Sequence, residues 1–396
     1  MAESRPAPGP DILDEVVDNR RHLHRHPEVG FEERSTSDFI RKRLGELGVQ
    51  LLECPTETGA LGLLDSGRPG RTVMVRADID ALPILEDSGV AFSSDSDGRM
   101  HACGHDAHTA ILLGVARTLS EQAESLTGRY VFVFQPAEEI VQGAKAMIEK
   151  GFFDRVQPDT AVGLHVWSTF DSGTVVTRPG VLWGGSDAFN IALSGPGGAT
   201  YMMARAGNVI AAQAFLVERL HTVVEGLEHE GTPCNCLVGG VTADGGTWNV
   251  VPPSVRLRGS LRTFTRDMRE EALDRLRGLL LETETEFSLQ TRFEISHGTI
   301  PIQNDPDVTR VVDETARELV GDRASRLGRP MVTSDDMAEF LAHVPGCYFM
   351  LGARPPDAET PPAHHSPGFR IDEDAFQVGV RVLTASAARL ARTSPG

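Results

Sequence analysis

Apolar residues at the beginning of the chain recur at the spacing of a helix. From Asp11 on, the segment ILDEVVDNRRHLHRHP predicts an amphipathic helix that Pro27 ends. The segment STSDFIRKRLGEL predicts a second helix, capped by Ser35 or Thr36 and stopped at Gly48. We therefore expect two helices before the first strand.

Short apolar runs then alternate with helical patterns such as HTAILLGVARTLSEQA and GAKAMIEKG. Strands that alternate with helices are typical of a mostly parallel sheet covered by helices, so we expect an α/β fold. The runs that predict its strands are 71–77, 129–135, 160–166 and 347–353.

The middle of the chain has a different order of elements. Between about Asp187 and about His297 the patterns predict strand, helix, strand, strand, helix and strand, which is the order of a ferredoxin-like βαββαβ sandwich. We interpret residues 187–297 as a lid domain inserted into an α/β domain that comprises residues 11–186 and 298–396.

Composition narrows the class of protein. The length of 396 residues suggests two or three domains, and 40% hydrophobic with 24% charged residues is ordinary for a soluble globular protein. A net charge of −18 without a basic run argues against nucleic acid as a partner, but it says nothing specific about the substrate. No stretch approaches the ~20 apolar residues of a membrane span, and the N-terminus has no apolar signal segment. Five scattered cysteines fit free thiols in a reducing compartment, so we expect a cytoplasmic protein without a membrane partner.

Acidic and imidazole side chains follow the predicted strands. In open α/β sheets ligands bind beyond the carboxyl ends of the strands, so these residues predict one site at that edge. They are Asp78 and Asp80 after the first run, Glu138 and Glu139 after the second, His165 at the end of the third, and His364 and His365 in the loop after the last.

The densest cluster of such residues is MHACGHDAHTA, which holds Cys103, His105, Asp106 and His108. A thiolate and an imidazole two residues apart suit a divalent metal such as zinc. Taken alone, the cluster is better interpreted with Cys103 as a small buried residue and His105 as a helix cap. The adjacent carboxylates Glu138 and Glu139 favour the metal interpretation, because one of them can bind a metal while the other acts as a general base on water.

Several motifs together resemble the M20 metallopeptidase family. They are RRHLHRHPEVGFEE, MVRADIDALPILE, MHACGHDAHTAILLG, VFQPAEE, GLHV, WNVVPPSVRLRGSLRTF, SDDMAEF and HHSPGFRIDED. The sequence is most similar to the amidohydrolase subfamily, which includes hippurate hydrolases, N-acyl amino acid amidohydrolases and auxin-conjugate hydrolases. The resemblance implies a catalytic α/β domain, a dimerising lid, hence a homodimer, and a two-metal centre.

The resemblance also implies a role for each matching residue. Glu138 becomes the general base and proton shuttle, and Asp80 a residue that orients a ligand. Asn249 and Arg262 match lid positions near the substrate, where an amide and a guanidinium suit a carboxylate or an oxyanion. Their alternatives are a turn residue and a strand-surface residue. The implied ligands of one or two divalent ions, zinc or manganese, are Cys103 as a bridge, His105, Glu139, His165 and His365, with His364 as the alternative to its neighbour.

The lid departs from the family pattern. Relatives carry Gly-Gly-His-Ala-x-x-Pro-His followed by Asp-Pro, whereas this chain has GGATYMMA at 197–204 and Asn208-Val209. The first missing histidine is the one expected to stabilise the tetrahedral intermediate, a contribution worth ~3 kcal/mol per donor elsewhere. We take Tyr201 as a candidate substrate-binding residue. Together with Met202, Met203, Trp183 and Trp248 it could line a larger pocket that accepts aromatic groups. The alternative is that these residues belong to the lid core or to the dimer interface.

Three hypotheses follow. The first is a metal-dependent hydrolase of the C–N bond of a small N-acyl amino acid or related amide. The second is a hydrolase of the same type with an unusual substrate, through aryl amine deamination or on an amide intermediate of secondary metabolism, as the missing lid histidines suggest. The third is a catalytically impaired protein that binds metal or ligand. The retained Glu138 argues against the third, because a binding protein does not need a base beside a ligand.

Overall fold

The computed structural model describes residues 10–392. These residues form two compact units. The first unit contains the chain up to Gly180, Gln303–Gly328 and the chain from Asp336 on, and the second contains Val181–Ile302 and Arg329–Asp335. The inserted unit is therefore made of one continuous stretch and one short segment that returns to it later in the sequence.

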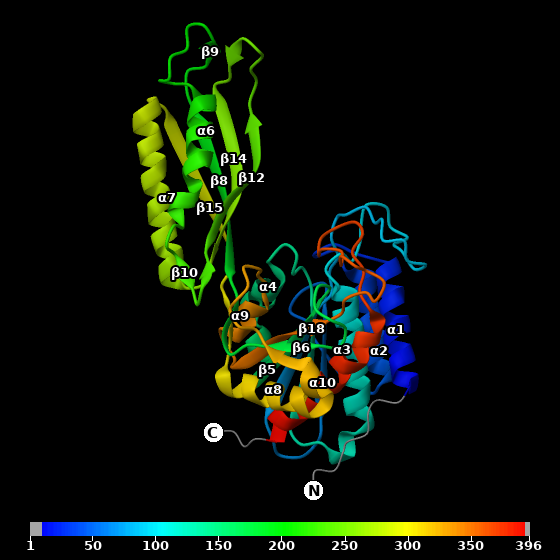
Figure 1. The fold of residues 1–396 in the computed structure, drawn as a ribbon. Helices are drawn as coiled ribbons and strands as arrows, with labels where there is room; N and C mark the ends of the chain where they lie inside the picture. The colour runs from blue at the N-terminus through cyan, green and yellow to red at the C-terminus, as the bar shows by residue number, and fades with distance from the viewer. Residues whose placement is uncertain (1–9, 393–396) are drawn as a thin grey trace. The chain divides into compact units, whose positions relative to one another are not determined.

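The first unit is built on an eight-stranded sheet with the order β1-β2-β4-β3-β5-β18-β6-β17 (Figure 1). Its central strands β4, β3, β5 and β18 are mutually parallel and correspond to the four predicted runs, which confirms the expected mostly parallel α/β sheet. The strands are β1 (Gln50–Leu52), β2 (Ala60–Asp65), β3 (Thr72–Asp78), β4 (Arg129–Gln135), β5 (Thr160–Trp167), β6 (Val175–Thr177), β17 (Ala324–Arg326) and β18 (Gly346–Gly352).

The central strands are apolar over nearly their whole length because both faces of the sheet are covered. All seven residues of β3 and of β18 are buried. Helix α3 packs against β3, and α1 and α10 pack against α3. The helices of this unit are α1 (Pro10–Arg25), α2 (Arg34–Glu46), α3 (His105–Glu121), α4 (Gly143–Glu149), α5 (Phe152–Arg155), α8 (Pro306–Val320), α9 (Met337–Leu341) and α10 (Phe376–Arg392), with the 3-10 turns η1 (Ala123–Ser125), η3 (Gly321–Arg323) and η4 (Glu373–Ala375).

Both predicted N-terminal helices are present, but the predicted cap of the second is wrong. Helix α2 begins at Arg34, so Ser35 and Thr36 lie inside its first turn. Their backbone N–H groups donate to the carboxylate of Glu28, at 3.1 and 2.8 Å. A carboxylate at a helix N-terminus satisfies unpaired N–H groups and interacts favourably with the helix dipole. Glu28, which precedes the helix, therefore accepts the hydrogen bonds that were expected to go to a hydroxyl cap.

The second unit has the predicted ferredoxin-like order. Its antiparallel sheet runs β12-β14-β8-β15, and α6 and α7 pack on its strands (Figure 1). Asn208, which stands where relatives are expected to have Asp, caps α6 by accepting the N–H groups of Ile210 and Ala211. The main elements are β8 (Gly185–Ser194), α6 (Val209–Arg219), β12 (Asn235–Ala243), β14 (Ser254–Thr263), α7 (Arg266–Phe287) and β15 (Gln290–Thr299).

Short elements complete the chain, namely β7 (Gly180–Trp183), β9 (Gly198–Ala199), η2 (Leu220–Val223), β10 (Glu228–His229), β11 (Thr232–Pro233), β13 (Val250–Val251) and β16 (Ile302–Asn304). All five cysteines are free thiols, as predicted, and four of them are buried. Within residues 10–392 no helix combines the length and the apolar character needed to cross a membrane.

Candidate metal and catalytic site

The residues predicted from strand ends converge in the first unit. His105 is the first residue of α3 and Cys103 lies just before this helix, His165 comes from β5, and Glu138 and Glu139 come from the loop after β4. Their ligand atoms form overlapping groups of three in which all the atoms lie within 4.8 Å of one another. Cys103 belongs to two such groups, one with His105 and His165 and the other with Glu139 and His365.

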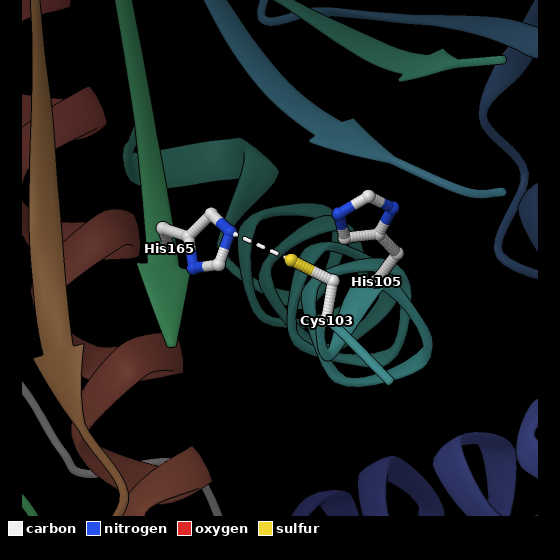
Figure 2. Close-up of side chains that lie close together, drawn as sticks. All are labelled: Cys103, His105 and His165. Carbon is white, nitrogen blue, oxygen red and sulfur yellow. Dashed lines mark hydrogen bonds between the residues drawn. The ribbon is translucent and has the colours of Figure 1, made fainter. Parts of the chain in front are cut away.

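Figure 2 shows Cys103 between the two imidazoles, with its sulfur 3.5 Å from Nε2 of His165. Nδ1 of His165 lies 2.6 Å from the carbonyl oxygen of Val166. Because a carbonyl only accepts hydrogen bonds, Nδ1 carries the proton and Nε2 presents its lone pair toward the sulfur. This tautomer is the one that a metal ligand needs.

His105 is oriented in the same way. Its Nδ1 lies 3.2 Å from Oδ1 of Asp80, so Nδ1 carries a proton and the neutral ring has its lone pair on Nε2. Among the described residues, Nε2 of His105 and Oε1 of Glu139 are buried without a hydrogen-bond partner, and 3.8 Å separates them. Leaving such atoms unpaired costs ~1–3 kcal/mol each, which a cation would offset. These atoms therefore fit a bound divalent metal.

Burial shapes the ionisation of this cluster. Desolvation and the nearby carboxylates of Asp80 and Asp78 raise the pKa of Glu139 to about 7. Burial likewise raises the pKa of the Cys103 thiol well above its ordinary value. Without a cation the thiol of Cys103 stays neutral and Glu139 is protonated more readily than an ordinary carboxyl group, and a bound cation would favour the thiolate and the carboxylate.

Asp80 contacts two of the predicted ligands at once. Its Oδ1 accepts the Nδ1–H of His105, and its Oδ2 accepts the backbone N–H of Glu139 at 2.9 Å. A carboxylate that holds a ligating histidine by its second nitrogen is a recurrent feature of metal sites. The side chain of Glu138 is also nearly buried, with Oε2 4.0 Å from Nε2 of His105.

The two adjacent histidines of the last loop have different surroundings. Nε2 of His365 lies 3.4 Å from Oε2 of Glu139, and its backbone has a left-handed φ of 62°. His364 instead packs its ring against Trp167 and Phe369, and its Nε2 accepts the backbone N–H of Ser168. Burial lowers the pKa of His364 to about 3. His365 therefore faces Glu139, whereas His364 packs under the loop with its Nδ1 3.9 Å from Sγ of Cys103.

Comparison with known proteins identifies the family of the chain. The model of peptidase family M20/M25/M40 matches residues 74–389. The chain belongs to this family. It is 34% identical over 393 residues to N-acetyl-L-cysteine deacetylase of Bacillus subtilis, covering 98% of this chain and 91% of that protein. It is 31% identical over 391 residues to IAA-amino acid hydrolase ILR1-like 2 of Arabidopsis thaliana, covering 96% and 86%.

Among solved structures, the YXEP protein of Bacillus subtilis, described as a dinuclear metal binding peptidase from the M20 family, superposes with a TM-score of 0.82. The two sequences are 28% identical, and the match covers 97% of this chain and 99% of that one. This M20 protein is accordingly a metal-dependent hydrolase of amide bonds.

The predicted substrate residues of this M20 enzyme lie in the second unit. Nη1 of Arg262 donates to Oγ of Ser334 at 2.8 Å, and Oδ1 of Asn249 accepts the hydroxyl of Thr247 at 2.7 Å. Tyr201 is 88% exposed. The two tryptophans considered for an aromatic pocket differ in exposure. Trp248 is 91% exposed, whereas Trp183 is 1% exposed and belongs to the interior.

The sequence grouped Asp78 with the strand-end residues and His108 with the dense cluster, but it gave neither of them an individual role. Nδ1 of His108 lies 2.6 Å from Oδ1 of Asp78, and its Nε2 accepts the backbone N–H of Val166 at 2.8 Å. Since both ring nitrogens are used within the protein, His108 holds the end of β5 next to His165 and does not compete for a metal. The available signal was the spacing of His105 and His108, which puts both on one face of a helix.

Proposed function

We propose that this enzyme hydrolyses the amide bond of a small N-acyl amino acid or a related amide, with Glu138 as the group that moves the proton. The observation that carries the proposal is the pair of buried, unpartnered atoms on His105 and Glu139 beside a second carboxylate. The acylated amino acids in the names of the relatives support the substrate class.

We propose that one or two divalent ions, zinc or manganese, are held by Cys103, His105, Glu139, His165 and His365. The mixture of thiolate, imidazole and carboxylate suits these borderline ions. Cys103 lies in two of the groups of three, one with imidazoles alone and one with Glu139 and His365, so its thiolate could contribute to either. A divalent cation supplies Lewis acidity, which lowers the pKa of water and polarises a carbonyl group.

In the proposed reaction, the carboxylate of Glu138 accepts a proton from the attacking water. It then delivers this proton to the departing nitrogen, so that a free amine leaves and a carboxylic acid remains. Asp80 keeps His105 in the tautomer with a lone pair on Nε2 and fixes the backbone of Glu139. The enclosure of Glu138 limits competing contacts with bulk water.

We further propose that Arg262, Asn249 and Tyr201 of the second unit contact the substrate and that the enzyme is a homodimer through this unit. A guanidinium suits the carboxylate of an acylated amino acid. Burial lowers the pKa of Arg262 below its ordinary value, but an arginine stays charged under all ordinary conditions. With Ala199 where relatives have histidine and Tyr201 exposed nearby, aromatic amides and aryl amines are the second substrate class to be tested.

The test is turnover by the metal-loaded protein. N-acetyl and N-benzoyl amino acids and a set of aryl amines are incubated with the enzyme, and the release of free amine or ammonia is followed. We expect release from the acylated amino acids and a loss of ~10²–10⁴-fold in kcat for Glu138→Gln at unchanged metal content. The matched control is Glu149→Gln, because Glu149 is exposed on α4. Full metal occupancy without any turnover would favour the metal-binding hypothesis instead.

A further inference from the structure

The loop that carries Glu138 and Glu139 has an unfavourable backbone. It connects β4 to α4, and Ala137 and Val141 both have a left-handed φ of 55°. Residues with a Cβ rarely adopt this conformation unless the surrounding structure imposes it. The two carboxylates thus lie between two strained positions, so their placement depends on contacts outside the loop.

The contact at the first strained position comes from the N-terminal part of the chain. Oε1 of Glu33 accepts the backbone N–H of Ala137 at 2.8 Å, although 104 residues separate the two. Glu33 is fully buried, and it directly precedes α2 without capping that helix by its side chain. The buried carboxyl group of Glu33 does not cap the helix that follows it, and it accepts a hydrogen bond from a distant loop instead. This bond satisfies a backbone N–H group of that loop.

The same N-terminal segment packs closely on the loop. A Cβ at Gly30 would lie 3.1 Å from Cα of Ala137 and 3.3 Å from Cδ1 of Ile140. This approach requires a glycine or a displaced neighbour. Segment 30–33 therefore contacts the loop through both its backbone and the carboxyl group of Glu33.

The segment also holds the loop that carries Asp80. The backbone N–H of Ala81 donates to the carbonyl of Glu28 at 2.8 Å, and Val29 forms a bridge with Ala81. Asp80 in turn accepts the backbone N–H of Glu139. One short stretch, 28–33, thereby fixes the loops after β3 and β4 relative to each other.

We propose that Glu33 is a positioning residue: its carboxyl oxygen holds Ala137 in the left-handed conformation and so sets the placement of Glu138 and Glu139. This inference rests on the function proposed above for those two residues. At the other end of the loop, Oδ2 of Asp336 accepts the backbone N–H of Ala144 at 3.0 Å. Asp336 also pairs with buried Arg76, so its replacement would disturb more than the loop.

The test compares Glu33→Gln, which keeps an acceptor oxygen, with Glu33→Met, which keeps the length of the side chain and removes the acceptor. We expect kcat for an N-acyl amino acid to stay within about threefold in Glu33→Gln and to fall ~10–100-fold in Glu33→Met, with KM little changed. The affinity for Zn²⁺, measured in the absence of substrate by competition with a chelator, falls ~10-fold or more in Glu33→Met alone.

The control is Glu32→Gln, because Glu32 belongs to the same turn but is exposed and paired with Arg99. Equal losses in Glu33→Gln and Glu33→Met, or wild-type kcat and Zn²⁺ affinity in Glu33→Met, would overturn the proposal. If the wild-type enzyme hydrolyses no substrate, the Zn²⁺ affinities still decide the positioning role, while the proposed function fails separately. If Glu33→Met does not fold, Gly30→Ala pushes a methyl group against Ala137 and is expected to weaken Zn²⁺ binding in the same way.

Discussion

Asp80→Asn tests how the metal site is oriented, because the substitution changes hydrogen bonding with almost no change in volume. Oδ1 of Asp80 accepts the Nδ1–H of His105, and Oδ2 accepts the backbone N–H of Glu139. An asparagine offers one acceptor oxygen and one NH₂ group, so one of these two donors must face another donor. The backbone N–H of Glu139 cannot change its role, whereas a histidine can change its tautomer.

The size of the expected effect follows from these two bonds. If the NH₂ group faces His105, the proton moves to Nε2 and removes the lone pair that a metal needs. If it faces Glu139, a bond to a charged acceptor worth ~1.5–3 kcal/mol is lost. Either outcome corresponds to about a 10–100-fold weaker metal affinity, since ~1.4 kcal/mol is a factor of ten.

The assay is competition for Zn²⁺ between the protein and a chromogenic chelator, followed by kcat/KM at saturating metal. Asp97→Asn is the matched control, because Asp97 is exposed in a loop of the same unit. We expect weaker Zn²⁺ binding and a lower kcat/KM in Asp80→Asn only. Wild-type Zn²⁺ affinity in Asp80→Asn would refute the argument that Asp80 sets the tautomer of His105.

Three further predictions concern stability. Arg76→Met leaves Asp78 and Asp336 buried without their common cation, so urea denaturation should show a loss of ~3–5 kcal/mol, and a loss below 1 would contradict the pairing. Burial raises the pKa of Glu33 to about 7, so folding favours its protonated form, and the free energy of unfolding of the wild type falls as the pH rises from about 4.5 to 7. Glu33→Gln lacks this ionisation, so its stability relative to the wild type should grow over the same range by up to about 3 kcal/mol. A constant difference in stability between about pH 5 and about pH 8 would contradict this. Asn208→Ala should cost ~1 kcal/mol by removing the cap of α6, and an unchanged midpoint would show that the cap contributes nothing.

The central architecture could be predicted from local patterns. The apolar residues 73–75 of β3 and the apolar run of β18 occur because each strand is covered on both faces, so this burial is visible in the sequence. The alternation of buried and exposed residues along β8 leaves an equally clear trace of a sheet with one covered face. The N-terminal cap of α2 was not predictable from its own residues, because its acceptor is Glu28 and lies before the helix.

The sequence proposes residues for the candidate site, whereas their geometry comes only from the fold. Parallel strands bring their carboxyl ends to one edge, which is why strand-end acids and histidines could be grouped from the sequence alone. The choice of His365 over its alternative His364 came from the family resemblance, and only the fold shows that His364 packs against Trp167 while His365 faces Glu139. The sequence assigned no role to Glu33, because the contact with Ala137 joins segments 104 residues apart.

The sequence by itself thus determined the elements, their order and the chemical groups at the strand ends, because these follow from periodicity and from residue type. The tertiary structure decided which nitrogen of each histidine bears a proton, which atoms are left buried without a partner, and which distant carboxyl group holds the loop of Glu138 and Glu139. These properties depend on the distances and orientations of residues far apart in the chain. Only the packed fold sets those distances, and they determine what the site can bind and which proton it can move.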